Sequence, residues 1–156
     1  MINVNNFTPE ERIDLIEVLL ASLNDVTKLV HQNNRDKGFW EKPIDLATRL
    51  MLINSELCEA VNADRKDKYS QIDKFEQELI KRKLSIDNFR IGDPNCEVIS
   101  KLFEKYVKDS FEDEFGDAFI RSLDVAGGIN LNNIFKHIIY KLRYNVTRDY
   151  MHGAKY

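Results

Sequence analysis

Two pairs of acidic residues carry most of the chemistry that the sequence offers. Glu56 and Glu59 lie three residues apart, and Glu114 and Asp117 repeat that spacing further along the chain. Each pair lies in a segment whose apolar residues recur at helical steps of three and four. Carboxylates on the inner sides of helices repel one another and lose hydration unless a cation compensates. One pair alone is typical of a solvated helix face, but two facing pairs would form a site for a hard divalent metal ion.

A second candidate group lies near the C-terminus. Lys141, Asn145 and Arg148 step by four and three and so share one face of a helix. A cation, an amide and a guanidinium on one face suit a polyphosphate, and His152 and Lys155 would extend this surface if the tail folds back. A basic helix end that complements its own dipole is the simpler interpretation, and the residues alone slightly favour it.

The third candidate is the turn that ends at Trp40, the only tryptophan of the chain. With Lys37 beside it and Gly38 as the turn residue, Trp40 could stack on a nucleobase. It could equally dock the turn onto a helical bundle, and physical grounds alone favour this packing role.

The elements that must position these residues are predicted to be helices throughout. Thr8, Pro9 and Glu11 form a capping-box start for a helix over 8–31. Further helices are predicted over 43–63, 75–84, 97–107, 111–128 and 132–146, with a loop over 88–95. Ser110 could cap the helix over 111–128. We expect two apolar stripes to be buried, one of Leu46, Leu50, Ile53, Leu57 and Ala60, and one of Phe115, Phe119, Leu123 and Val125. The predicted class is all-α.

Composition narrows the class of protein. The chain has 156 residues, enough for a single domain over 1–156, with 43% hydrophobic and 31% charged residues. A net charge of −3 with dispersed basic residues speaks against an extended nucleic-acid surface. We expect no membrane span, no signal peptide and a cytoplasmic location. Cys58 and Cys96 are expected to be reduced thiols, with Cys58 packed as a small hydrophobe.

Four stretches together resemble the MazG-like all-α nucleoside triphosphate pyrophosphohydrolases. They are Lys37-Gly38-Phe39-Trp40, the segment from Leu52 to Ala60, Glu114-Phe-Gly-Asp117, and Lys141-xxx-Asn145-xx-Arg148-xxx-His152-Gly153. The resemblance covers about 28–63 and 110–156. It does not cover the segment over 64–109, which is an atypical insertion between the two acidic motifs.

The resemblance implies a function and roles for the residues. A MazG-like enzyme hydrolyses nucleoside triphosphates between the α and β phosphates, giving a monophosphate and pyrophosphate. The resemblance implies that Glu56, Glu59, Glu114 and Asp117 bind Mg²⁺, with Mn²⁺ as a substitute. Four carboxylates exceed what one hydrated Mg²⁺ needs, so either Glu56 or Glu59 could instead orient the attacking water. The resemblance further implies a nucleotide pocket, and a helical bundle completed as a homodimer or homotetramer. The residues of that pocket would be Lys37, Trp40, Lys141, Asn145 and Arg148.

Two alternatives stay open at this point. A nucleotide-binding or interaction bundle would keep the fold without turnover, although all four acidic residues are present. A carboxylate-bridged di-iron bundle also buries acidic pairs, but that class uses Glu-x-x-His motifs, which neither acidic pair provides.

Overall fold

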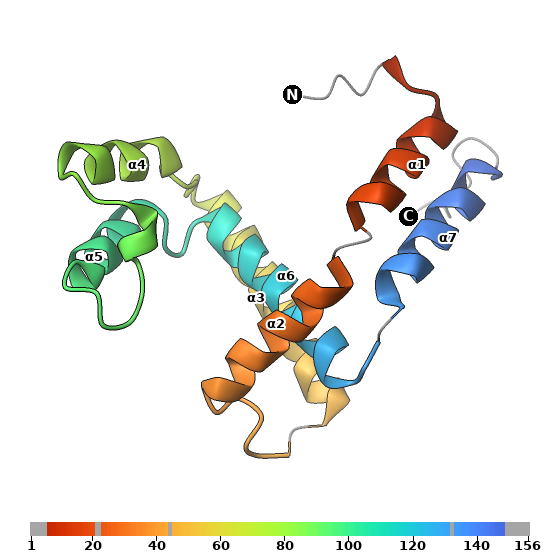
Figure 1. The fold of residues 1–156 in the computed structure, drawn as a ribbon, viewed down its shortest axis with the longest axis horizontal. Coiled ribbons are helices and arrows are strands. Elements are labelled where there is room, and N and C mark those ends of the chain that lie inside the picture. Colours follow the sequence, from red (N-terminus) through yellow and green to blue (C-terminus); the bar gives the residue numbers. More distant parts are fainter. Residues whose placement is uncertain (1–5, 21–22, 44, 132, 149–156) are drawn as a thin grey trace. The chain divides into compact units, whose positions relative to one another are not determined.

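The computed structural model describes residues 6–20, 23–43, 45–131 and 133–148, and these residues form helices without a strand. The all-α prediction is therefore confirmed for this part of the chain (Figure 1). The elements in order are α1 (Pro9–Leu20), α2 (Leu23–Asp36), α3 (Leu46–Arg65), α4 (Ile72–Lys81), the 3₁₀ turn η2 (Ile86–Asn88), α5 (Cys96–Tyr106), α6 (Phe111–Gly128) and α7 (Ile134–Val146).

The chain divides into two compact units. Unit 1 comprises Met1–Pro43 and Leu123–Tyr156, and unit 2 comprises Ile44–Ser122. Within the described ranges, none of the helices combines the length and the apolar character that crossing a lipid bilayer demands. The prediction of a single domain over 1–156 stays a prediction.

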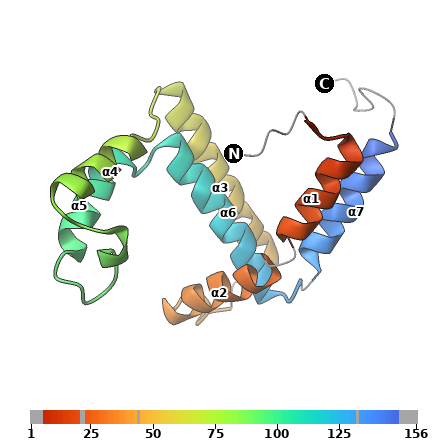
Figure 2. The ribbon, with the colours of Figure 1, turned by 45° about the horizontal axis from the view of Figure 1, so that its top comes forward.

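In unit 1, α1 and α7 lie side by side (Figures 1 and 2). Ile13 of α1 and Phe135 and Ile139 of α7 are buried. The capping box at the start of α1 is confirmed: the Glu11 amide donates to Thr8 Oγ1 at 3.2 Å, and Glu11 Oε2 accepts from the Thr8 amide at 2.8 Å. The helix predicted over 8–31 corresponds to α1 (Pro9–Leu20) and the first part of α2 (Leu23–Asp36); its continuity between them falls on residues 21–22, outside the described part of the chain.

The C-terminal end of α6 also belongs to unit 1, where two glycines allow close packing. A Cβ at Gly127 would lie 2.5 Å from the Thr27 carbonyl oxygen and 2.7 Å from His31 Cβ. A Cβ at Gly128 would overlap the ring of Trp40. The pair therefore lets α2 and the Trp40 ring approach the helix backbone more closely than any other residue type would allow.

Unit 2 is organised around α3 and α6, which lie side by side (Figures 1 and 2). Asp45 caps α3 by accepting from the Thr48 amide at 2.9 Å. Ser110, which is almost fully buried, caps α6 by accepting from the Asp113 amide at 3.3 Å, as the sequence predicted.

The segment over 64–109 has a small core of its own. Phe75 and Leu79 of α4 pack with Ile99 and Leu102 of α5 and with Val107 beyond it. The two helices contact each other directly. This segment, which the family resemblance does not cover, is therefore a helical hairpin with its own buried side chains.

The two predicted apolar stripes are largely exposed, which corrects the expectation from sequence. Leu46, Leu50 and Leu57 of α3 are exposed, and so are Phe115 and Phe119 of α6, at 43% and 59%. The predicted buried position of Cys58 is also wrong, because this residue is exposed; both cysteines are free. Helical spacing identifies an apolar face but not what covers it. In α3 the predicted burial is confirmed for Ala60, and the other buried residues of this helix are Arg49, Glu56 and Ala63.

Candidate metal centre and its surroundings

Three acidic side chains from the two motifs meet between α3 and α6. Carboxylate oxygens of Glu56, Glu114 and Asp117 all lie within 4.8 Å of one another. Glu56 and Glu114 are buried, at 7% and 8% exposure, whereas Asp117 is exposed. The spacing of three residues puts Glu114 and Asp117 on one side of α6, and the packing of the two helices brings Glu56 of α3 to that side.

Glu56 already has a cationic partner in the same unit. Its Oε1 accepts a hydrogen bond from Nε of Arg121 at 2.6 Å. Arg121 lies four residues after Asp117, so the guanidinium projects from the same side of α6. This pair neutralises one carboxylate of the three.

Glu114 lacks such a partner. No described side chain donates a hydrogen bond to its carboxyl group, which is nine-tenths buried. Loss of hydration, with the neighbouring carboxylates of Glu59 and Asp113 adding to it, raises the pKa of Glu114 from 4.5 to about 7. The group is therefore about half protonated near neutral pH in the metal-free protein.

Asp117 and Glu59 complete the acidic surroundings. Loss of hydration is the main cause that raises the pKa of Asp117, and the negative charges of Asp113 and Glu56 contribute in the same direction. Glu59 is exposed, and its Oε1 accepts from Ser55 Oγ at 3.3 Å. It lies outside the group of three but close enough to contribute to the shift of Glu114.

An open pocket adjoins the centre on the Glu59 side. Its volume is about 320 Å³, and Glu59 and Glu114 share it with the two lysines that follow α3, Lys66 and Lys68. Lys68 Nζ lies 3.4 Å from Asp109 Oδ2. The pocket thus sets two cations beside the carboxylate group, an arrangement that suits a bound anion next to a metal ion.

The donor set fits a hard divalent cation. Three carboxylates from two rigid helices offer oxygen ligands, which Mg²⁺ and Mn²⁺ prefer. The Glu114 carboxyl also favours a bound cation, because it is buried and unpaired and its charged form is disfavoured without one. Glu56, Glu114 and Asp117 would hold the ion, with Glu59 at the edge of the site.

The residues predicted to bind the nucleotide all belong to unit 1. On α7, Lys141 Nζ lies 5.0 Å from the ring centroid of Tyr144, and the guanidinium carbon of Arg148 lies 5.8 Å from the same centroid. The buried Oδ1 of Asn145 accepts no hydrogen bond from a described residue. Lys37 is exposed in the turn after α2. His152 and Lys155 lie outside the described residues. The nucleotide-binding role of this group stays a prediction.

Trp40 belongs to a hydrogen-bonded group that the sequence did not reveal. Its Nε1 donates to the buried carboxylate of Asp124 at 2.9 Å. Nδ1 of His31 lies 2.9 Å from the same carboxylate, and the two rings meet edge to face with centroids 4.6 Å apart. Gly38 precedes the indole with φ +83°, as a turn glycine should. These contacts correspond to the packing role of Trp40, which the sequence analysis gave as the alternative to stacking on a nucleobase.

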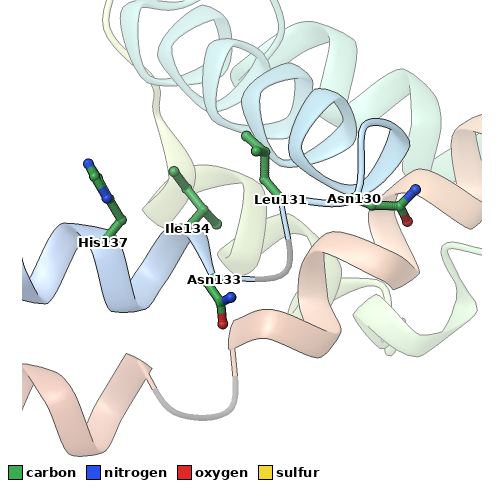
Figure 3. Close-up of a pocket in the computed structure, with 5 residues that line it drawn as sticks. All are labelled: Asn130, Leu131, Asn133, Ile134 and His137. Carbon is green, nitrogen blue, oxygen red and sulfur yellow. The ribbon is translucent and has the colours of Figure 1, made fainter.

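Unit 1 also contains a hollow of about 420 Å³ beside the start of α7, lined by Asn130, Leu131, Asn133, Ile134 and His137 (Figure 3). The side chains of Asn130 and Asn133 point in different directions in this view, so their polar groups do not converge on one point. His137 is exposed on the helix.

Sequence reasoning missed several residues that the structure brings to these sites. Arg121 could have been found from its position four residues after Asp117 on a helix. Lys66 and Lys68 follow α3 directly, but only the packing of the segment over 64–109 shows that they border the carboxylates. The contacts of Asp124 could not be predicted, because nothing in the sequence links this residue to His31 and Trp40.

Comparisons with known proteins give no relative for this chain. No protein-family model matches it. No curated protein matches it either. The solved structures likewise contain no match. The family resemblance described above therefore depends on the motifs alone.

Proposed function

We propose that this chain is a Mg²⁺-dependent nucleoside triphosphate pyrophosphohydrolase that cleaves between the α and β phosphates. The observation that carries the proposal is the meeting of Glu56, Glu114 and Asp117, from both acidic motifs, within 4.8 Å. The resemblance to MazG-like enzymes suggested that these residues share one site, and their spacing in the structure supports it.

Different residues would bind the metal ion and the phosphates in such a reaction. A bound divalent ion supplies charge neutralisation at the phosphate oxygens. Glu114 and Asp117 would hold it from α6, and Glu56 would hold it from α3. Lys66 and Lys68 line the adjoining pocket and would bind phosphate oxygens that the ion does not reach.

The attacking water needs a carboxylate that remains partly free. Glu59 fits this role because it is exposed at the edge of the group and lies next to the pocket that would hold the phosphates. Glu56, the other candidate for the base, has its Oε1 engaged by Arg121.

The test is release of pyrophosphate from a panel of ribo- and deoxyribonucleoside triphosphates with and without Mg²⁺. Glu56→Gln and Asp117→Asn are expected to abolish release. Asp117→Asn should keep a wild-type thermal melt, because removing a charge from an acidic group relieves repulsion. Glu56→Gln should also stay folded, because the amide oxygen of the new side chain can still accept from Arg121 Nε. Glu97→Gln, on the exposed pair with Lys101, is the matched control and should retain full activity. Near-wild-type turnover by both site variants would refute the assignment.

One observation favours a second candidate, a nucleotide-binding bundle without turnover. Arg121 places a permanent cation on Glu56, at 2.6 Å, where an ion would otherwise bind. If the guanidinium replaces the metal, the wild type should bind triphosphates without Mg²⁺ and release no pyrophosphate. The same panel separates the two functions.

We also propose that a second copy of the chain covers the apolar faces of α3 and α6. Large exposed side chains occur on these two helices, namely Leu46, Leu50, Met51, Leu57, Val61, Phe115 and Phe119. Many large apolar side chains exposed on two neighbouring helices are unusual on a monomer and typical of a subunit interface. A homodimer or homotetramer would bury it.

A further inference from the structure

A pocket of about 370 Å³ lies between the helical hairpin of α4 and α5 and one side of α6, entirely within unit 2. Ile72, Phe103 and Val107 line it from the hairpin segment, and Ile120 lines it from α6. Ile72 and Ile120 each remain 47% exposed at this pocket. Its volume and its mostly apolar walls are those of a small-molecule site.

The pocket shares one residue with the candidate metal centre. Asp117 lines the pocket and also supplies one of the three oxygens of the carboxylate group. A ligand held by its phosphates at that group would therefore have this pocket beside it for the rest of the molecule.

Gly116 lies on the wall of this pocket, in the middle of α6. A Cβ built on it would meet nothing within 4 Å, in contrast to Gly127 and Gly128. Glycine inside a helix is destabilising relative to alanine, and packing does not require it at this position. The missing side chain instead keeps the pocket open.

One wall offers a fixed aromatic ring. Phe103 of α5 is half-buried, and its ring is held by Phe75, edge to face with centroids 6.1 Å apart, and by Phe89 at 5.9 Å. A ring held between two other rings is a suitable surface for a planar heterocycle.

Two carboxylates supply the polar groups. Glu112 Oε2 accepts from the Ser70 amide at 2.7 Å, and Asp113 Oδ2 accepts from the Asp109 amide at 2.8 Å. The other oxygen of each carboxylate accepts no hydrogen bond from a described residue, and both residues line the pocket. A carboxylate accepts hydrogen bonds and donates none, so it selects ligands that present N–H groups and repels carbonyl oxygens.

We propose that this pocket holds the nucleobase of the substrate and prefers bases with an exocyclic amino group. The inference rests on the proposed function, since the phosphates of the same nucleotide would lie at the carboxylate group. It assigns to the segment over 64–109, through Phe103 and Ile72, the selection of the base.

The steric test uses Gly116→Leu, which fills the pocket without a backbone clash. It should raise KM for every nucleotide by about tenfold or more. The inhibition constant of the product pyrophosphate should stay unchanged, because pyrophosphate has no base. Ser122→Leu adds the same side chain to an exposed position of α6 outside the pocket, and should leave both constants unchanged.

The chemical test compares dCTP with dUTP, which present an amino group and a carbonyl at the same ring position. The wild type should prefer dCTP in kcat/KM by roughly tenfold to a hundredfold, the range for a base-specific hydrogen bond. Glu112→Gln keeps an acceptor for the Ser70 amide but adds a donor, so this preference should fall.

The outcomes separate this inference from the function on which it rests. A wild type that releases no pyrophosphate from any nucleotide overturns both. Turnover with equal KM values in Gly116→Leu and the wild type overturns the pocket alone. The pocket is also overturned if Trp40→Phe changes the preference for dCTP and Glu112→Gln does not. The base would then lie at the turn of unit 1. A change in oligomeric state of Gly116→Leu without a change in KM would assign the pocket to a subunit contact.

Discussion

At Glu114 a proton and the proposed metal ion would compete for one carboxyl group. The folded-state pKa of about 7 exceeds the ordinary value of 4.5, so the folded protein binds more protons than the unfolded chain between these pH values. The stability of the metal-free protein should therefore fall as the pH rises from about 4.5 to about 7, by roughly 3 kcal/mol.

The measurement for Glu114 is a series of thermal melts between pH 5 and 8. In Glu114→Gln the decline with pH should be much shallower, because the titrating group is gone. With Mg²⁺ present the wild type should lose its decline as well, since the ion binds the deprotonated form and stabilises it by mass action. Parallel curves for wild type and variant would show that Glu114 has an ordinary pKa.

Arg121 gives a second test at the level of single residues. Arg121→Gln leaves Glu56 buried without a cation, and should lower the stability of the metal-free protein by about 1–3 kcal/mol. Mg²⁺ should restore most of this loss, because it can replace the guanidinium.

Lys101→Gln is the control for Arg121. Lys101 and Glu97 form a pair at the same distance, 2.6 Å, but both side chains are exposed. Such a pair contributes little, so the melting temperature should hardly change. If the two variants lose equal stability, Glu56 does not depend on Arg121.

Among the elements, α6 contains three glycines whose environments differ. Gly116→Ala should stabilise the protein by about 0.5–1 kcal/mol, because nothing contacts the new methyl group and the unfolded chain loses freedom. Gly127→Ala and Gly128→Ala should destabilise it by about 1–3 kcal/mol, because their methyl groups would press on Thr27 and on the Trp40 ring. Urea unfolding measures the free energies of unfolding of the three variants. If Gly116→Ala is less stable than the wild type, the space beside Gly116 is not open.

The helices also show what the sequence could and could not predict. The starts of α1 and α6 were predictable because the capping residues Thr8, Glu11 and Ser110 act within a few positions of the chain. The exposure of Leu50 and Phe119 was not predictable, because an apolar period is the same whether or not the rest of the chain covers it. The three carboxylates at the centre were predictable from repeated spacing, whereas Arg121 depends on how α3 meets α6.

At the scale of the whole molecule, the exposed apolar side chains of α3 and α6 predict an assembly. Leu50→Glu and Phe119→Glu should shift the protein toward a monomer in sedimentation velocity, because a charge in an apolar interface lacks a partner. Ile91→Glu is the control: Ile91 is 87% exposed in the loop after η2 and away from both helices. A wild type that sediments as a monomer at all concentrations would refute the interface.

The single tryptophan gives the protein an optical reporter of its own. Trp40 belongs to unit 1, where its indole touches an imidazole and a carboxylate, and the chain has no tryptophan in unit 2. Its fluorescence emission therefore follows only the environment between α2 and the end of α6. Far-ultraviolet circular dichroism instead follows the helices of both units. Coincident curves from the two signals would mean that the units unfold as one cooperative body, and separated curves would give each unit its own midpoint without any added dye or label.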